Sequence, residues 1–229
     1  MMSLVNALPG AVAQGLIWGI MAIGVYLTFR ILDIADLTVD GSLGTGGAVC
    51  IMLMLSGQNV WVAMAGATAA GMAAGLATGL LQTFMGIPAI LAGILTQLGL
   101  YSINLKTMGK ANQAINVDKY DLLVSLRFIR KVPFYQNTIL VVSIAIIVLI
   151  AVLYWFFGTE LGCSLRATGC NDKMARAQGI NTDLCRVLGL MISNGLVALS
   201  GAMLCQYQGF ADINMGRGAI VIGLAAVII

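Results

Sequence analysis

The chain has no histidine, and charged residues make up only 9% of its 229 residues. Histidine is the commonest metal ligand and the usual general base near neutral pH, so its absence argues against most metal-dependent and acid–base enzymes. None of the five cysteines lies in a CxxC pair, and all fall in or beside apolar segments, which argues against an extracellular disulfide framework. No GxxxxGK[ST] segment is present, so we expect any ATP to be bound by another chain.

The scarcity of charge also excludes an ordinary water-soluble domain, in which about a quarter of the residues are charged. Hydrophobic residues make up 60% of the chain, and the mean hydropathy is +0.97. No charged residue lies between Asp40 and Lys106, and a bilayer-spanning helix needs only about 20 apolar residues. Continuous apolar runs predict helices, which satisfy their own backbone hydrogen bonds in lipid. We therefore expect an all-α fold, a polytopic transmembrane helix bundle.

About six to seven apolar segments can be identified. Five of them predict spans, namely 11–29, 60–84, 88–105, one within 132–157, and 187–205. The run 43–55 is short and rich in glycine, and it fits a half-helix, a buried segment or a full span that includes part of the preceding motif. The final run has only 12 residues after Arg217, so it is either re-entrant or cut short.

Glycine recurs in the apolar segment 60–84 at intervals of five, four and four. Such spacing predicts close helix packing, because small residues let backbones approach each other in lipid. The residues are Gly66, Gly71, Gly75 and Gly79.

Two polar loops interrupt the apolar pattern, at 106–136 and at 158–183. The first carries six basic and two acidic residues, but the net charge of the chain is only +3, so we expect no nucleic-acid partner. In the second loop, Asn171 is a good N-cap, Asp172 lies in the first turn and Gly179 suits the position after a helix end. These signals predict a helix of about two turns that could dock on a partner protein. The alternative is an ordinary cytoplasmic loop obeying the positive-inside rule.

The same loop carries the pattern G-x-x-L-R-A-T-G-x-N-x-x-x-A-x-x-x-G-I from Gly162 to Ile180. This pattern resembles the cytoplasmic coupling loop of permeases in the branched-chain amino acid and ribose class of ABC importers. The segments 26–42 and 199–212 are similar to a less-characterised branch of that class, which is associated with binding proteins for aromatic amino acids and related solutes.

The resemblance implies one transmembrane permease domain over 1–229 in the bacterial inner membrane, embedded in the lipid bilayer. It implies ABC ATPase subunits that hold ATP and Mg²⁺, a second permease copy and an extracytoplasmic solute-binding protein, with no cofactor in this chain. Members of the family have further spans after the position of Ile229. The ATPase-coupling positions that match are Gly162, Arg166, Ala167, Thr168, Gly169, Asn171, Ala175, Gly179 and Ile180.

One span separates the two loops, so we expect them to face opposite sides of the membrane. Charge counting would put 106–136 in the cytoplasm, whereas the resemblance puts 158–183 there. We follow the resemblance, and expect 106–136 to face the binding protein through Arg130 and Lys131.

Polar residues inside apolar segments are candidates for a solute path, because carboxylates at membrane depth usually mark a pathway or a partner contact. Each could instead cap a helix or pair two helices. The candidates are Asp36, Thr38, Asp40, Gln97, Asn104, Gln206 and Asn214. A short internal echo, A-D-L-T-V at 35–39 and A-D-I-N-M at 211–215, precedes two glycine-containing runs, as at the interrupted helices of repeated transporter halves.

Two alternatives to an ABC permease remain at the level of sequence. One is an ion-coupled secondary transporter that uses Asp36 or Asp40 as its ion site. The other is a non-transporting structural subunit of a membrane complex, which would leave the acidic, glycine-interrupted segments without a role. No combination of nucleophile, base and metal ligand indicates an enzyme.

Overall fold

The computed structural model describes residues 2–115, 122–124 and 138–228, with side chains from Leu8 onward in the first helix. The elements in chain order are α1 (Met2–Tyr26), the π-helical turn η1 (Leu27–Ile31), α2 (Thr38–Leu55), α3 (Val60–Thr83), α4 (Ala89–Met108), β1 (Asn112–Ala114), α5 (Thr138–Phe157), α6 (Glu160–Cys170), α7 (Asp172–Ala177), α8 (Thr182–Gln208), β2 (Phe210–Asp212) and α9 (Ala219–Ile228). Six helices in these ranges, namely α1 with η1, α2, α3, α4, α5 and α8, are long and apolar enough to cross a membrane. The expected all-α polytopic bundle is confirmed.

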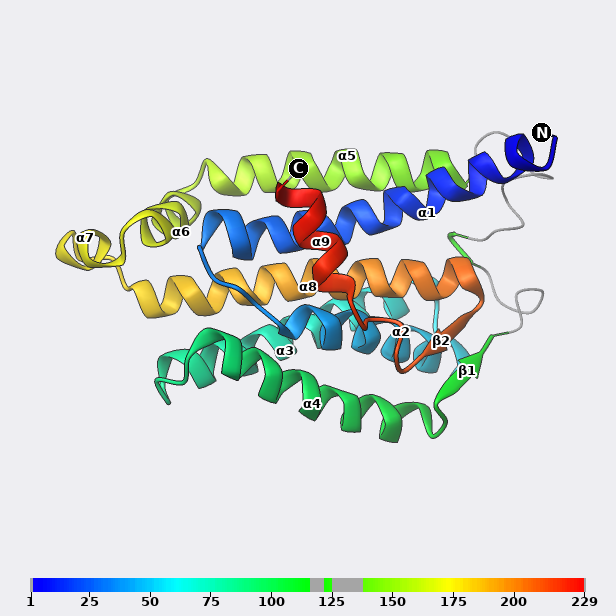
Figure 1. The fold of residues 1–229 in the computed structure, drawn as a ribbon, viewed down its shortest axis with the longest axis horizontal. Coiled ribbons are helices and arrows are strands. Elements are labelled where there is room, and N and C mark those ends of the chain that lie inside the picture. Colours follow the sequence, from blue (N-terminus) through cyan, green and yellow to red (C-terminus); the bar gives the residue numbers. More distant parts are fainter. Residues whose placement is uncertain (1, 116–121, 125–137, 229) are drawn as a thin grey trace.

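Helix α8 forms the centre of the bundle (Figure 1). It packs against α1, α2 and α3, and most of its length is buried. Helix α5 packs on α1 and α6 and has few buried residues, as is typical of a helix that faces lipid. The short helix α9 lies across α1 and α2.

Three of the four regularly spaced glycines hold α3 against α8. A Cβ atom at Gly71 would collide with the carbonyl oxygen of Asn194, and one at Gly75 with that of Leu190. A Cβ atom at Gly79 would lie 3.0 Å from Val187. The prediction of close packing is confirmed at these positions, because only a hydrogen atom fits between the two backbones.

The short run that began at Leu43 belongs to a full span. Helix α2 starts at Thr38 and has 18 residues, so the acidic motif contributes its first turn, including Asp40. The chain reaches α2 through a linker in which Asp33 has a φ of +55°. This left-handed conformation is uncommon outside glycine but is more accessible to aspartate than to most residues.

One helix end and two short elements differ from the sequence-based expectation. Helix α8 runs to Gln208 rather than ending at Cys205, so Gln206 lies in a helix instead of a loop. The following segment forms β2, which pairs antiparallel with β1 from the first polar loop. The second polar loop holds two helices, because Thr159 caps a further helix, α6, that begins at Glu160. These short elements depend on contacts or caps that hydrophobic periodicity does not detect.

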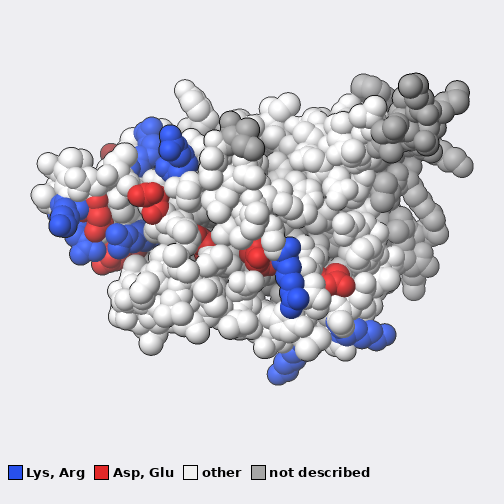
Figure 2. Space-filling model, in the orientation of Figure 1, with Lys and Arg blue, Asp and Glu red and all other residues white. Residues whose placement is uncertain are grey.

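The two polar ends of the bundle lie at opposite ends of its long axis, with α6 and α7 at one and the β1–β2 pair at the other (Figure 1). Figure 2 shows charged side chains gathered at the α6–α7 end, while most of the remaining surface on this face is uncharged. Arg130 and Lys131, expected to face a binding protein, lie outside the described residues.

Candidate functional site

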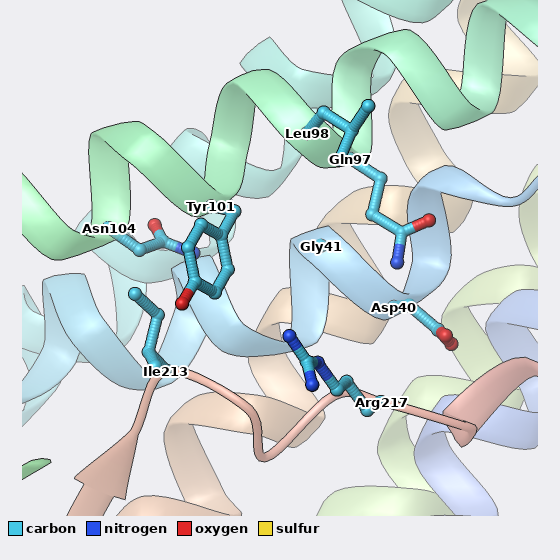
Figure 3. A pocket seen from close by; sticks show the side chains of 8 residues that line it. All are labelled: Asp40, Gly41, Gln97, Leu98, Tyr101, Asn104, Ile213 and Arg217. Atoms are coloured by element: carbon cyan, nitrogen blue, oxygen red, sulfur yellow. The ribbon is translucent and has the colours of Figure 1, made fainter. Parts of the chain in front are cut away.

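A cavity of about 260 Å³ lies between α2, α4 and the segment that joins β2 to α9 (Figure 3). It brings together three of the predicted path residues, namely Asp40, Gln97 and Asn104. The other lining residues are Gly41, Leu98, Tyr101, Ile213 and Arg217.

Several polar groups of this cavity have no hydrogen-bonding or ion-pair partner among the described residues. Asn104 is only 3% exposed, yet neither its side chain nor that of Gln97 makes a hydrogen bond within the described part of the chain. The Arg217 guanidinium lies 6.0 Å from the centre of the Tyr101 ring, a cation–π distance, and forms no ion pair with any described residue. Buried polar groups normally have a hydrogen-bonding partner, so these groups are available to a bound molecule.

Asp40 has a defined structural role at the edge of the cavity. Its Oδ2 accepts a hydrogen bond from the backbone N–H of Gly218 at 3.1 Å, and its Oδ1 accepts one from Ile220 at 2.9 Å. The carboxylate of α2 thereby satisfies the free N–H groups at the start of α9 and complements the positive end of that helix. Gly216 lies directly against the Asp40 carbonyl oxygen, where a Cβ atom would not fit.

Asp36 lies apart from the cavity and joins the linker to α8. Its Oδ2 accepts a hydrogen bond from Asn194 Nδ2 at 2.7 Å, and its Oδ1 accepts one from the Thr38 backbone N–H at 2.9 Å. The Ser42 hydroxyl donates to Asn194 Oδ1 at 2.5 Å. All of these groups are buried, so this predicted path residue is satisfied by the protein itself.

The other three predicted path residues also lie outside the cavity lining. The Thr38 hydroxyl is 2.8 Å from that of Thr78, which donates to Thr96 at 3.0 Å, so it pairs helices. Gln206 is buried within α8, and its amide donates to the Cys50 sulfur at 3.5 Å.

Asn214 is exposed, and its backbone N–H donates to Asp212 Oδ1 at 2.7 Å. That bond has the geometry of the one between Thr38 N and Asp36 Oδ1, so the A-D-x-x-x echo forms the same turn twice. Each turn precedes a helix, α2 or α9. The echo therefore has a structural counterpart. The residues directly after its two copies, Asp40 and Gly216, lie against each other.

Sequence reasoning missed Tyr101 and Arg217 as members of the cavity. Arg217 was treated only as the end of a loop, although a lone cation directly before an apolar run was a usable signal. Tyr101 had no such signal, because an aromatic residue in a span is ordinary. Asn194, the partner of Asp36, was also missed because the two are far apart in sequence.

At the α6–α7 end, the predicted coupling residues fall into two groups. Gly162, Arg166, Ala167, Thr168 and Gly169 lie in α6, where a Cβ atom at Gly169 would collide with the Ile31 carbonyl oxygen. The Arg166 side chain is exposed and donates to the Phe157 carbonyl oxygen at 3.1 Å. Helix α6 is thus seated against the end of η1.

The second group forms α7 and its ends. Asn171 Oδ1 accepts a hydrogen bond from the Met174 N–H at 3.0 Å, which confirms the expected N-cap. Ala175 is fully buried, Gly179 has a φ of +83°, and the Ile180 N–H donates to the Ala175 carbonyl oxygen at 3.1 Å. The short helix predicted between Asn171 and Gly179 is therefore present.

Arg176 attaches α7 to the start of α8. Its Nε donates to Thr182 Oγ1 at 2.7 Å, and its guanidinium lies 2.9 Å from Asp183. The outer surface of this end presents large apolar side chains, with Met174 52% exposed and Leu184 51% exposed. These exposed apolar side chains are accessible to a partner protein at this end of the bundle.

Comparisons with known proteins agree with this architecture. The chain is 38% identical over 225 residues to a tyrosine transport system permease protein of Clostridioides difficile (strain R20291), covering 98% of this chain and 72% of that protein. It is 37% identical over 224 residues to an uncharacterised protein of Rickettsia prowazekii (strain Madrid E), covering 98% and 76%. It is 29% identical over 213 residues to the autoinducer 2 import system permease protein LsrC of Yersinia pseudotuberculosis (strain IP32953), covering 92% and 58%. No solved structure shows a significant match.

A family model described as the permease component of the branched-chain amino acid transport system matches residues 8–229. Together with six apolar helices, this match identifies a multi-pass membrane protein, of the inner membrane in bacteria, whose role is transport rather than catalysis. The chain belongs to the branched-chain amino acid transport system permease family.

Proposed function

We propose that this chain is the membrane-embedded permease subunit of an ATP-binding-cassette importer for a small solute such as an amino acid. The observation that carries the proposal is the projecting pair α6 and α7. Its capped short helix has a buried face and an outer face with exposed Lys173 and Met174. An ATPase dimer that closes on ATP would push this end, and Arg176 would transmit the movement to α8.

The predicted coupling residues divide between contact and support in this proposal. Arg166 is exposed and could touch the ATPase. Ala175 is buried and Gly169 lies against the Ile31 backbone, so these two would act by holding α6 and α7 in place. The ATPase partner would bind ATP and Mg²⁺, and a second permease copy and a solute-binding protein would complete the importer. The tyrosine transport name of one relative supports an amino acid as the solute.

An ion-coupled secondary transporter is less well supported. Its ion site was expected at Asp36 or Asp40, but both carboxylates accept two hydrogen bonds from the protein. A purely structural subunit would have no need of a cavity with unpaired polar groups. We therefore favour transport driven by a partner ATPase.

Co-purification of an ATPase subunit from membranes tests the proposal. The informative variant is Lys173→Glu with Met174→Asp, since both side chains are exposed and their replacement leaves the buried face of α7 intact. The matched control is Lys106→Glu with Lys110→Glu at the opposite end. We expect the ATPase to co-purify with the native chain and the control but not with the α7 variant. A native chain that purifies alone and transports on an ion gradient would contradict the proposal.

A further inference from the structure

We propose that Arg217 binds a carboxylate group of the solute, an inference that rests on the transport function proposed above. Its guanidinium lines the cavity between α2 and α4 and forms no ion pair within the described residues. Helix α9, which begins two residues later, starts well inside the two ends of α8 (Figure 1). The Arg217 side chain is exposed where it lines the cavity, so its charge is accessible to an anionic group of an incoming solute.

The acidic residue nearest in the cavity lining does not neutralise Arg217. Both oxygens of Asp40 accept hydrogen bonds from the start of α9, and the carboxylate and the guanidinium are farther apart than an ion pair. Figure 3 shows the guanidinium directed into the space between Tyr101 and Gln97, with the Asp40 carboxylate turned to the side. The lining therefore carries one cation and one anion that do not form an ion pair with each other, so the guanidinium can still pair with the carboxylate of a solute.

The backbone around Arg217 is held in place. Its own N–H donates to the Asn214 carbonyl oxygen at 3.0 Å, and the N–H of the next residue, Gly218, donates to Asp40. The side chain also lies over the Tyr101 ring. The guanidinium thus projects from a fixed point of the backbone, and its planar pair of N–H groups matches a carboxylate.

The other polar side chains of the cavity can hydrogen-bond to the remaining polar groups of a small zwitterionic solute. Gln97 and Asn104 line the same cavity with unpaired amides that can both donate and accept hydrogen bonds. The volume of about 260 Å³ lies just below the range of roughly 300–1,000 Å³ that suits drug-sized ligands. A molecule of amino-acid size with one carboxylate meets these conditions.

Matched ligands with and without the carboxylate test this assignment. We would measure equilibrium binding to the full chain in lipid nanodiscs, using L-tyrosine against tyramine and L-leucine against 3-methylbutylamine. The variants are Arg217→Gln and Arg217→Lys, with Lys106→Gln as a control for loss of one exposed positive charge outside the cavity.

We expect the native chain to prefer at least one amino acid over its amine. Arg217→Gln should weaken binding of that amino acid about tenfold or more, since a charge-assisted pair is lost, without weakening binding of the amine. Arg217→Lys should restore part of the affinity, and Lys106→Gln should have no effect. Equal amino-acid binding by the native chain and Arg217→Gln, or no amino-acid binding at all, would overturn the assignment.

The transport function is judged separately, from association of the native chain with an ATPase subunit. If the ATPase does not associate but Arg217-dependent binding is observed, the proposed importer fails while the carboxylate site stands. If the ATPase associates and binding does not depend on Arg217, the importer stands and the carboxylate site fails.

Discussion

Asn194 in α8 donates a hydrogen bond of 2.7 Å to Asp36 in the linker before α2, which joins two parts of the chain that are 158 residues apart. Both residues are buried, and Asn194 also accepts a hydrogen bond from Ser42. The carboxylate that looked like a candidate ion site is therefore the anchor that positions the start of α2 against the central helix.

Replacing Asp36 with alanine should lower the stability of the bundle by about 2 kcal/mol, because the buried Asn194 amide loses one of its two acceptors and keeps only the Leu190 carbonyl oxygen. Thermal unfolding in detergent micelles would measure the loss. Asp212→Ala is the matched control, since Asp212 forms the same turn but has only a local hydrogen bond to Asn214 among those described. A loss for Asp212→Ala as large as that for Asp36→Ala would contradict the role assigned to the Asn194 contact.

Replacing Asp40 with alanine should loosen the start of α9, because the N–H groups of Gly218 and Ile220 lose their acceptor. The loss of a capping group typically costs about 1 kcal/mol. Hydrogen exchange should therefore become faster at these amides, by roughly fivefold to tenfold. Asp40→Asn keeps one acceptor oxygen and should give an intermediate rate.

The same Asp40→Asn variant separates the capping role from ion coupling. It removes the titratable group while it retains part of the cap, so transport driven by ATP should persist. Complete loss of transport by Asp40→Asn in a protein that still exchanges slowly at Ile220 would favour an ion site at this position.

Replacing Gly75 with alanine should destabilise the bundle, because the new methyl group would collide with the Leu190 carbonyl oxygen. Overpacking of this kind costs about 1–3 kcal/mol. Gly99→Ala in α4 is the control, since no atom lies within 4 Å of the position of its Cβ. There alanine should be neutral or stabilising by up to about 1 kcal/mol, because it favours the helix. Thermal unfolding should therefore show a lower melting temperature for Gly75→Ala and an unchanged or higher one for Gly99→Ala.

Removing the Arg176 side chain should uncouple α7 from α8 with little effect on global stability. Its ion pair with Asp183 is half exposed, with 53% and 50% of the two side chains accessible, and exposed pairs contribute at most about 1 kcal/mol. In the reconstituted importer, Arg176→Ala should reduce solute-stimulated ATP hydrolysis more than it reduces ATPase association. If association and stimulation fall together, Arg176 is part of the docking surface instead.

Most of the secondary structure could be predicted because its signals are local. The long apolar runs around α3, α4 and α8 identified those spans, and Asn171 and Gly179 identified both ends of α7. The glycines of α3 also predicted their own close contacts. Helix α6 and the β1–β2 pair were missed, since the first is weakly apolar and the second forms between segments about 100 residues apart.

The candidate path was predicted less completely, because a polar residue in an apolar segment has the same appearance whether it binds solute or another helix. Gln97 and Asn104 line the cavity without a hydrogen-bonding partner in the part of the chain that the structure describes, whereas Thr38 and Gln206 pair with neighbouring helices. Only the three-dimensional arrangement distinguishes the two cases.

By itself, the sequence determined the membrane-spanning class, the family and the short helix at the coupling end, since composition, motif and capping residues act within a few turns of the chain. The tertiary structure decided the roles of the charges. Asp36 and Asp40 bind α8 and α9 through hydrogen bonds, whereas Arg217 lines a cavity with no ion pair to a described residue. The physical reason is that the free-energy cost of a charge in an apolar bundle depends on the hydrogen-bonding groups around it. Those groups come from other helices, so only the packed structure determines them.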